Sequence, residues 1–235
     1  MASIAEKAGC SRPAVYQYFT NKEEVVAALA IEAAALRNRL YQRVPAFTAR
    51  PRERLVALAE VDAILYPAWP VLEETTYANA LRGRTSAGRR KELRAAQRVA
   101  YDAFLLEVSA AIAAGDLVLP PTVDVDHLIF TLATFSTGLF APISRGLPDL
   151  SDRRLDPRAA MRRLGSAFLD GIAWRPLTSE WNYRETLHRI YTEVFPPEFL
   201  AELGLESSRP NNQARPPRPL RSKRSLASRR PAQES

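Results

Sequence analysis

The sequence predicts an all-α protein in which an N-terminal helix-turn-helix head is joined by a long helix to a larger helical body. Glycine accounts for only 9 of 235 residues, while alanine, leucine, arginine and glutamate are abundant, and these residues favour helices over strands. Apolar residues recur at spacings of three and four, as on one face of an amphipathic helix. No apolar run approaches the roughly 20 residues of a membrane span.

Three parts with different compositions are predicted. Residues 1–44 hold the incomplete head and its connecting helix, 45–206 hold the body, and 207–235 form a tail rich in Pro, Ser and Arg. The tail holds eight of the 33 basic and one of the 26 acidic residues, so 25 of each sign precede it and the net charge of +7 lies in the tail. We expect this tail to be disordered, either as a solvated extension or as a nonspecific contact for DNA phosphates.

Three helices are predicted in residues 1–44, and local signals mark their ends. Gly9 suits a left-handed C-terminal cap after residues 3–8, and Ser11 suits the N-cap of the second helix. Asn21, with Glu24 three residues later, resembles a capping box at the start of the third helix. That helix is expected to run to about residue 44, and one of its faces is lined by Val25, Leu29, Ala33, Leu36 and Leu40.

The body is predicted to contain further helices separated by proline-rich or glycine-rich breaks. They cover about residues 52–66, 71–82, 89–114, 126–141, 157–174 and 180–195, with a short piece at 197–203. Proline 67 is expected to end or kink the first of these helices. The basic run Arg89, Arg90 and Lys91 at a helix start is expected to be a solvent-exposed face.

The second helix of the head has the residues of a DNA-reading helix. The major groove is wide enough for an α-helix, and there Arg12 can reach guanine or a phosphate, Gln17 can pair with adenine, and Ala14 can touch a thymine methyl group. Tyrosine hydroxyls and a lysine beside a helix N-terminus suit phosphates. The predicted DNA-binding residues are therefore Ser11, Arg12, Pro13, Ala14, Tyr16, Gln17, Tyr18 and Lys22.

The segment IAEKAGCSRPAVYQYFTNKEEVVAAL, residues Ile4–Leu29, resembles the TetR/AcrR family of bacterial one-component regulators. The shared features are the IAxxAG helix and turn, the serine, the YxYF recognition helix, and the Lys-Glu pair that opens the next helix. This resemblance implies a homodimer that pairs through the helices near 126–141 and 157–174. It also implies a ligand cavity between about residues 52 and 141 whose occupation changes the spacing of two reading heads.

The resemblance also implies one further helix before residue 3, and this chain begins where that helix should already be under way. Uncovering even a few hundred Å² of apolar surface would cost several kcal/mol at roughly 25 cal/mol per Å². We therefore expect either a start upstream of Met1, which we favour, or a degenerate regulator whose head is loose.

Aromatic residues of the body are candidates for the lining of an effector pocket, although a helical core uses the same residue types. They are Tyr66, Trp69, Tyr77, Tyr101, Phe104 and Phe135.

The sequence favours no redox, metal or catalytic site. Cys10 lies in the turn of the head, where a small apolar side chain would pack, so we expect a buried structural thiol. Asp124, Asp126 and His127 lie at a helix start, where an acid usually acts as a cap, and only one other histidine is present. There is no glycine-rich phosphate loop, CxxC pair or GxSxG motif. No metal, no cofactor and no enzymatic activity are predicted.

The sequence thus predicts a ligand-responsive DNA-binding transcriptional regulator, a repressor that acts as a homodimer on a palindromic operator and responds to a small-molecule effector. The alternative is a dimeric small-molecule-binding protein that has lost specific DNA binding. The N-terminus lacks the basic and apolar regions of a signal peptide, and the single cysteine suits a reducing compartment. A cytoplasmic location is therefore expected.

Overall fold

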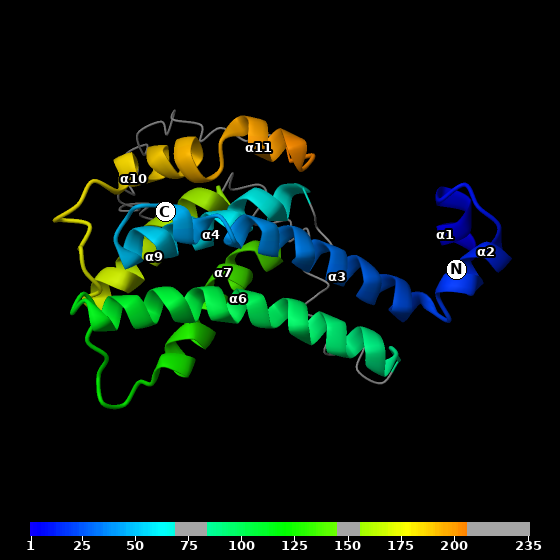
Figure 1. Ribbon diagram of the computed structural model, residues 1–235, viewed down its shortest axis with the longest axis horizontal. Helices are drawn as coiled ribbons and strands as arrows, with labels where there is room; N and C mark the ends of the chain where they lie inside the picture. The colour runs from blue at the N-terminus through cyan, green and yellow to red at the C-terminus, as the bar shows by residue number, and fades with distance from the viewer. Residues whose placement is uncertain (69–83, 145–155, 206–235) are drawn as a thin grey trace, which may run out of the picture.

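The computed structural model describes residues 1–68, 84–144 and 156–205, and within these ranges every regular element is a helix and no strand occurs (Figure 1). The all-α prediction is therefore confirmed. None of the described helices combines the length and apolar character that crossing a bilayer requires. The elements are α1 (Ala2–Lys7), α2 (Arg12–Tyr18), α3 (Lys22–Tyr41), η1 (Val44–Ala46), α4 (Pro51–Ala68), α6 (Ala87–Ala113), α7 (Val125–Ser144), α9 (Pro157–Gly171), α10 (Tyr183–Arg189), η2 (Ile190–Val194) and α11 (Pro197–Glu202).

Helices α1 and α2 form the predicted helix-turn-helix, and backbone caps fix the turn between them. Gly9 adopts a φ of +64°, and the N–H of Cys10 donates to the carbonyl of Ala5 at 3.0 Å, as in a Schellman cap. The hydroxyl oxygen of Ser11 then accepts a hydrogen bond from the N–H of Ala14 at 3.3 Å and caps α2. The turn residues therefore act as their chemistry predicts.

The prediction of a buried thiol at Cys10 is wrong. The Cys10 side chain is exposed, whereas Ala5 and Val15 are the buried apolar residues of α1 and α2. Cys10 is held in the turn by its backbone N–H, and that hydrogen bond requires nothing of the side chain.

Alanines form much of the buried surface of α3, and Leu29 of the predicted apolar face is exposed, although Ala33 and Leu40 of that face are buried. Leu29 is 37% exposed, whereas Ala27, Ala30 and Ala34 are each at most 3% exposed. On the same side of α3, the Nδ2 of Asn38 donates to a backbone carbonyl of α6 at 3.0 Å. Figure 1 shows α3 and α6 running side by side. Small side chains on the shared face allow the two backbones to approach closely.

Several helix ends differ from the predictions by two or three residues, and three of them have their bounds near a cap or a proline. Helix α3 ends at Tyr41 and the 3₁₀ turn η1 follows, so the helix stops short of residue 44. Helix α4 continues through Pro67 to Ala68, two residues beyond the predicted end. Helix α6 begins at Ala87 rather than at Arg89, because Ser86 caps it. The predicted helix over 71–82 and the tail over 207–235 lie outside the described residues.

One hydrophobic core joins α3, α4, α6, α7 and α9 to the C-terminal helices, and α4 contacts most of them. The largest fully buried side chain is that of Trp174, which follows α9. At Gly165 on α9, a Cβ atom would lie 3.7 Å from the ring of Phe135 on α7, so the two helices pack closely there. Other core residues are Leu40, Leu58, Leu65, Val108, Leu117, Ile190, Phe195 and Leu200.

Alanine substitutions at Gly88 and Gly115, at opposite ends of α6, are expected to change stability in opposite directions. No atom lies within 4 Å of the Cβ position at either glycine, so steric clash does not decide the outcome. Gly88→Ala removes conformational freedom from the unfolded chain and should raise the free energy of unfolding by about 0.4–1 kcal/mol. Gly115 has a φ of +74°, a left-handed conformation that is unfavourable for alanine. Gly115→Ala should therefore lower the free energy of unfolding by about 1 kcal/mol. Urea denaturation measures the free energy of unfolding of each variant. Changes of the same sign in the two variants would contradict the roles given to these glycines.

Candidate DNA-reading head and effector cavity

Helix α2 presents most of the predicted DNA-reading side chains to solvent. At about 100° per residue, Arg12, Tyr16 and Gln17 fall within an arc of about 140°, and all three are exposed. The buried residue Val15 lies outside this arc. Tyr18 is 75% exposed but lies on the opposite side of α2 from the arc. Of the other predicted residues, those exposed are Ser11, Pro13 and Lys22, and the half-buried one is Ala14.

A cluster that we call the head clamp holds the start of α3 against the start of α6. Its members are Asn21, Glu23 and Glu24 on one side and Arg84, Ser86 and Arg89 on the other. Asn21 caps α3 by accepting the N–H of Glu24 at 2.8 Å, and its Nδ2 donates to the carbonyl of Arg84 at 2.9 Å. Glu23 pairs with Arg84 at 3.1 Å. The clamp therefore holds the start of α3, which directly follows α2, against the start of α6.

Glu24 is the buried centre of the head clamp. One carboxylate oxygen accepts the N–H of Ser86, and the other accepts the Nε–H of Arg89 at 2.6 Å. Burial alone would raise the pKa of Glu24, but the hydrogen bonds from Ser86 and Arg89 outweigh it and lower that pKa below its ordinary value. The carboxylate thus lies ionised at the N-terminus of α6, where the helix dipole favours an anion. The capping-box prediction is half correct, because Asn21 caps α3 while Glu24 bonds to α6.

Arg89 links α6 to the head in a second way, and sequence reasoning missed it. Its guanidinium lies 5.2 Å from the ring centroid of Phe19, the residue that follows α2. Arg89 and Arg90 are half-buried rather than exposed, and only Lys91 fits the predicted solvent face. No local pattern could have shown this, because Glu24 lies 65 positions from Arg89 in the sequence.

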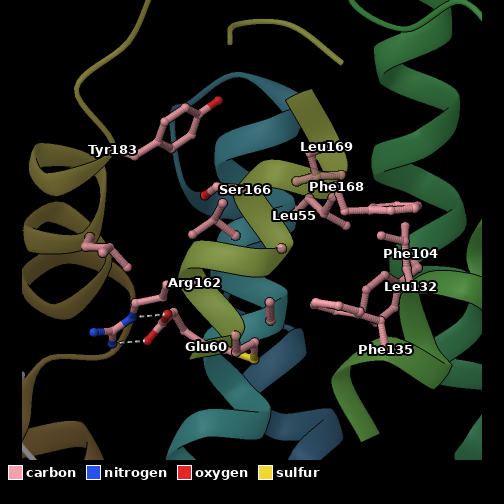
Figure 2. Close-up of a pocket in the computed structure, with 15 residues that line it drawn as sticks. Leu55, Glu60, Phe104, Leu132, Phe135, Arg162, Ser166, Phe168, Leu169 and Tyr183 are labelled. Carbon is pink, nitrogen blue, oxygen red and sulfur yellow. Dashed lines mark hydrogen bonds and ion pairs between the residues drawn. The ribbon is translucent and has the colours of Figure 1, made fainter. Parts of the chain in front are cut away.

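A cavity of ≈ 90 Å³ lies among α4, α6, α7, α9 and α10 (Figure 2). Phe104 and Phe135, two of the predicted pocket residues, line it. The rings of Phe135 and Phe168 stack with their centroids 6.3 Å apart. The other apolar lining residues are Leu55, Val56, Ala59, Leu132, Met161, Gly165, Leu169 and Leu187, and the polar ones are Glu60, Arg162, Ser166 and Tyr183.

Among the side chains that the structure describes, no other predicted pocket residue lines this cavity. Tyr101 and Phe104 line a second hollow of ≈ 290 Å³ beside α3 and α7. The Tyr101 hydroxyl donates to Asp126, and this hydrogen bond raises the pKa of Tyr101. The side chain of Tyr66 and the whole of Trp69 and Tyr77 lie outside the described residues.

Of the two acids at the start of α7, Asp124 acts as the predicted cap, whereas Asp126 accepts the Tyr101 hydroxyl. Asp124 accepts the backbone N–H of His127 at 2.8 Å, as a cap does, and contacts its Nδ1 at 2.8 Å. Within the described ranges, no three His, Cys, Asp or Glu side chains group closely enough to hold a metal ion.

One ion pair forms the polar side of the ≈ 90 Å³ cavity. The carboxylate of Glu60, which is fully buried, accepts from Arg162 through Nε at 2.7 Å and Nη2 at 2.6 Å. The Tyr191 hydroxyl donates to the same carboxylate at 2.7 Å. Burial alone would lower the pKa of Arg162, but its bonds to Glu60 outweigh this and raise it, so the guanidinium stays charged. Sequence reasoning did not identify this pair, whose members are 102 positions apart.

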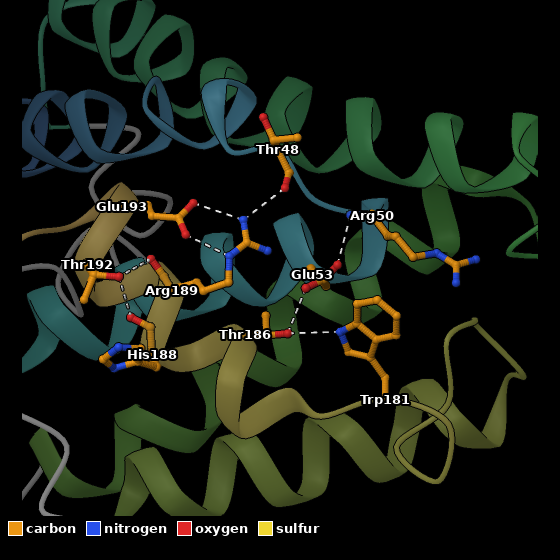
Figure 3. Close-up of polar contacts among 9 residues, drawn as sticks. All are labelled: Thr48, Arg50, Glu53, Trp181, Thr186, His188, Arg189, Thr192 and Glu193. Carbon is orange, nitrogen blue, oxygen red and sulfur yellow. Dashed lines mark hydrogen bonds and ion pairs between the residues drawn. The ribbon is translucent and has the colours of Figure 1, made fainter.

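A second buried carboxylate ties the cavity wall to the C-terminal helices (Figure 3). Glu53, near the start of α4, is 2% exposed and accepts the hydroxyl of Thr186 on α10 at 2.8 Å. It also accepts the N–H of Arg50 at 3.1 Å. The Nε1–H of Trp181 donates to the oxygen of Thr186 at 3.2 Å. These bonds fix the position of α10, which contributes to the cavity wall.

Comparison with known proteins identifies the head. A model of the family described as "Bacterial regulatory proteins, tetR family" matches residues 1–29. The match spans α1, α2 and the first turns of α3, and so includes all eight predicted DNA-reading residues. No curated protein and no solved structure matched the chain. The body is therefore interpreted from its own geometry.

The Thr186→Val variant is expected to lower the free energy of unfolding by about 1.5–3 kcal/mol, because it removes a hydrogen bond from the buried carboxylate of Glu53. Thr192→Val is the matched control (Figure 3). Thr192 is exposed and its hydroxyl donates to the carbonyl of His188, so its loss should change stability by less than about 0.5 kcal/mol. Urea denaturation of both variants gives the comparison. Equal losses would contradict the role assigned to Thr186.

Proposed function

We propose that the chain is a ligand-responsive repressor, since residues 1–29 match the tetR family of bacterial regulatory proteins and this match supports a DNA-binding transcriptional regulator. In this proposal residues 1–44 read DNA, and residues 45–206 bind the effector and a second copy of the chain. Two copies bind a palindromic operator, and the effector releases them. The observation that carries the proposal is that α6 both holds the reading head and lines the cavity.

The exposed arc of α2 supports base reading. Arg12 and Gln17 have side chains that form paired hydrogen bonds with guanine and adenine edges in the major groove. The hydroxyl of Tyr16 and the ammonium group of Lys22 suit phosphates, which position a protein on DNA without reading sequence. All four are exposed on the head. Arg12 and Gln17 are thus proposed as base readers, and Tyr16 and Lys22 as phosphate contacts.

Exposed apolar side chains on α7 and α9 support a homodimer. Phe130 on α7 is 70% exposed and Leu164 on α9 is 53% exposed. These helices overlap the two ranges, 126–141 and 157–174, through which the resemblance implies pairing. Burial of such side chains against a second copy would remove apolar surface from water. We therefore place the dimer interface on α7 and α9.

The response to an effector is proposed to travel along α6. Phe104 on α6 lines the cavity, and Arg89 in its first turn bonds to Glu24 in the head clamp. Because a helix is stiff, a displacement at Phe104 that makes room for a ligand would move the start of α6 and the head with it. A ligand can shift affinity for DNA only by binding the two arrangements differently.

Arg12→Ala and Gln17→Ala should each weaken binding to the operator by about 1–3 kcal/mol and binding to random DNA by less. The operator is first obtained by selection from a random DNA library with the unaltered protein. Fluorescence anisotropy at one fixed salt concentration then gives both affinities. Equal losses on both DNAs would contradict base reading and favour the alternative, a ligand-binding dimer without specific DNA recognition.

Lys22→Ala and Tyr16→Phe are the matched controls for that experiment. A phosphate contact carries no sequence information, so these variants should weaken binding to operator and random DNA by similar factors. Lys22→Ala should also reduce the salt dependence of binding by about one counterion. A change of sequence preference in Lys22→Ala would show that Lys22 reads bases.

Leu164→Asp should weaken dimerisation at least tenfold, because it would place a carboxylate in the proposed apolar interface. Leu106→Asp is the control, since Leu106 on α6 is 51% exposed but lies outside α7 and α9. Sedimentation velocity across a concentration series reports the dimer affinity of each variant. If Leu106→Asp had the larger effect, the interface would involve α6 instead.

A further inference from the structure

We propose that the ≈ 90 Å³ cavity binds a small apolar molecule with a primary ammonium group, which takes the place of Arg162 on the carboxylate of Glu60. This inference rests on the proposed function, because it names the chemical class of the effector. The juxtaposition that carries it is a buried carboxylate in the wall of a mostly apolar cavity, paired with an arginine that is partly exposed to solvent.

The cavity offers a ligand one charged anchor. Figure 2 shows the pair of Glu60 and Arg162 on one side and the rings of Phe104 and Phe135 on the other. The hydroxyl of Tyr183 is already engaged, because it donates to a backbone carbonyl at 2.6 Å. An apolar body against the rings and one polar end at Glu60 therefore match the shape of the site.

Glu60 is fixed in place and requires a cation. Its side chain is 1% exposed, it lies within α4, and Tyr191 donates a hydrogen bond to it. A carboxylate buried without a partner cation is strongly destabilising. Any molecule that removes Arg162 from Glu60 must therefore supply a positive charge of its own.

Arg162 is the member of the pair that can leave. Its side chain is 23% exposed, against 1% for that of Glu60. Rotation of the guanidinium into water returns it to a favourable environment, and a ligand ammonium then keeps the buried charge balanced. The movement also frees the space next to Glu60. The present cavity of ≈ 90 Å³ is smaller than the cavity of about 150 Å³ that is known to hold benzene, so this added space is what admits a larger ligand.

Other ligand classes fit the site less well. A carboxylate ligand would place a second negative charge beside Glu60 in a poorly solvated space, which disfavours its ionised form. An uncharged ligand would leave the ion pair intact and have only ≈ 90 Å³ available, whereas a cavity of about 150 Å³ is known to hold benzene. The charge of Glu60 thus selects an ammonium group.

The test compares three probes that share a six-carbon chain and differ in head group: hexylamine, 1-hexanol and hexanoate. Isothermal titration calorimetry of the full chain at neutral pH measures each affinity, and the amine is protonated there because its pKa is near that of lysine. Hexylamine is expected to bind at least tenfold more tightly than hexanol, and hexanoate most weakly. Equal or tighter binding of hexanol or hexanoate, or no binding of hexylamine, would overturn the proposal.

Variants of the ion pair make the assignment specific. Arg162→Met removes the competing cation and should increase the affinity for hexylamine and enlarge the rise in Tm that hexylamine causes. Arg163 is an exposed neighbour that does not line the cavity, so Arg163→Met should leave the hexylamine affinity and the hexylamine-induced rise in Tm unchanged. Glu60→Gln should abolish the preference for hexylamine over hexanol. A loss of hexylamine affinity in Arg162→Met would overturn the proposal. If either variant does not fold, the ranking of the three probes on the unaltered protein decides.

Operator binding separates this inference from the proposed function. If hexylamine binds in the predicted order but leaves operator affinity unchanged, the cavity assignment stands and ligand-driven release fails. If hexylamine does not bind while the protein still binds its operator, the ligand class is wrong and the DNA-binding assignment stands.

Discussion

The buried carboxylate of Glu24 joins the start of α3, which directly follows the reading helix α2, to the start of α6. A carboxylate removed from water must be hydrogen-bonded or paired, or it destabilises the fold by several kcal/mol. Glu24 finds both kinds of partner at the start of α6, in the N–H of Ser86 and the guanidinium of Arg89. Other positions of the start of α3 would leave the charge without these partners, so the clamp favours one arrangement of α3 against α6.

The same rule recurs in the body, where buried acids fix how the helices pack. Glu53 and Glu60 lie two turns apart on α4 and bond to α10 and α9, respectively. Glu107 on α6 pairs with Arg54 on α4 at 2.8 Å, although burial raises the pKa of Glu107. Apolar packing alone tolerates small shifts between helices, whereas each of these bonds forms in one geometry. The cavity wall and the head are therefore both positioned by charges that need a specific partner.

The sequence predicts well what depends on neighbours in the chain. The caps at Ser11 and Asn21 and the turn at Gly9 follow from residues within four positions, as do the existence and order of most described helices. Contacts between residues far apart in the sequence could not be predicted. The local pattern therefore predicts that Arg89 is solvent-exposed and gives no sign of the ion pair between Glu60 and Arg162. The prediction that Leu29 lies on the buried face of α3 is also wrong. Leu29 is exposed, and alanines form much of the buried surface of this helix. In the candidate site, Phe104 and Phe135 line the cavity, while Tyr101 lies beside the second hollow.

The central claim, that Glu24 fixes the head on α6, is tested most directly by the distance between the two. Cys10, the one cysteine of the chain, is exposed in the head and accepts a spin label, and Leu106→Cys on α6 provides the second site. Pulsed electron resonance on protein diluted with unlabelled chain should give one narrow distance distribution. Glu24→Ala should broaden it, whereas Glu32→Ala, at an exposed position of α3, should not. An equally narrow distribution in Glu24→Ala would contradict the account.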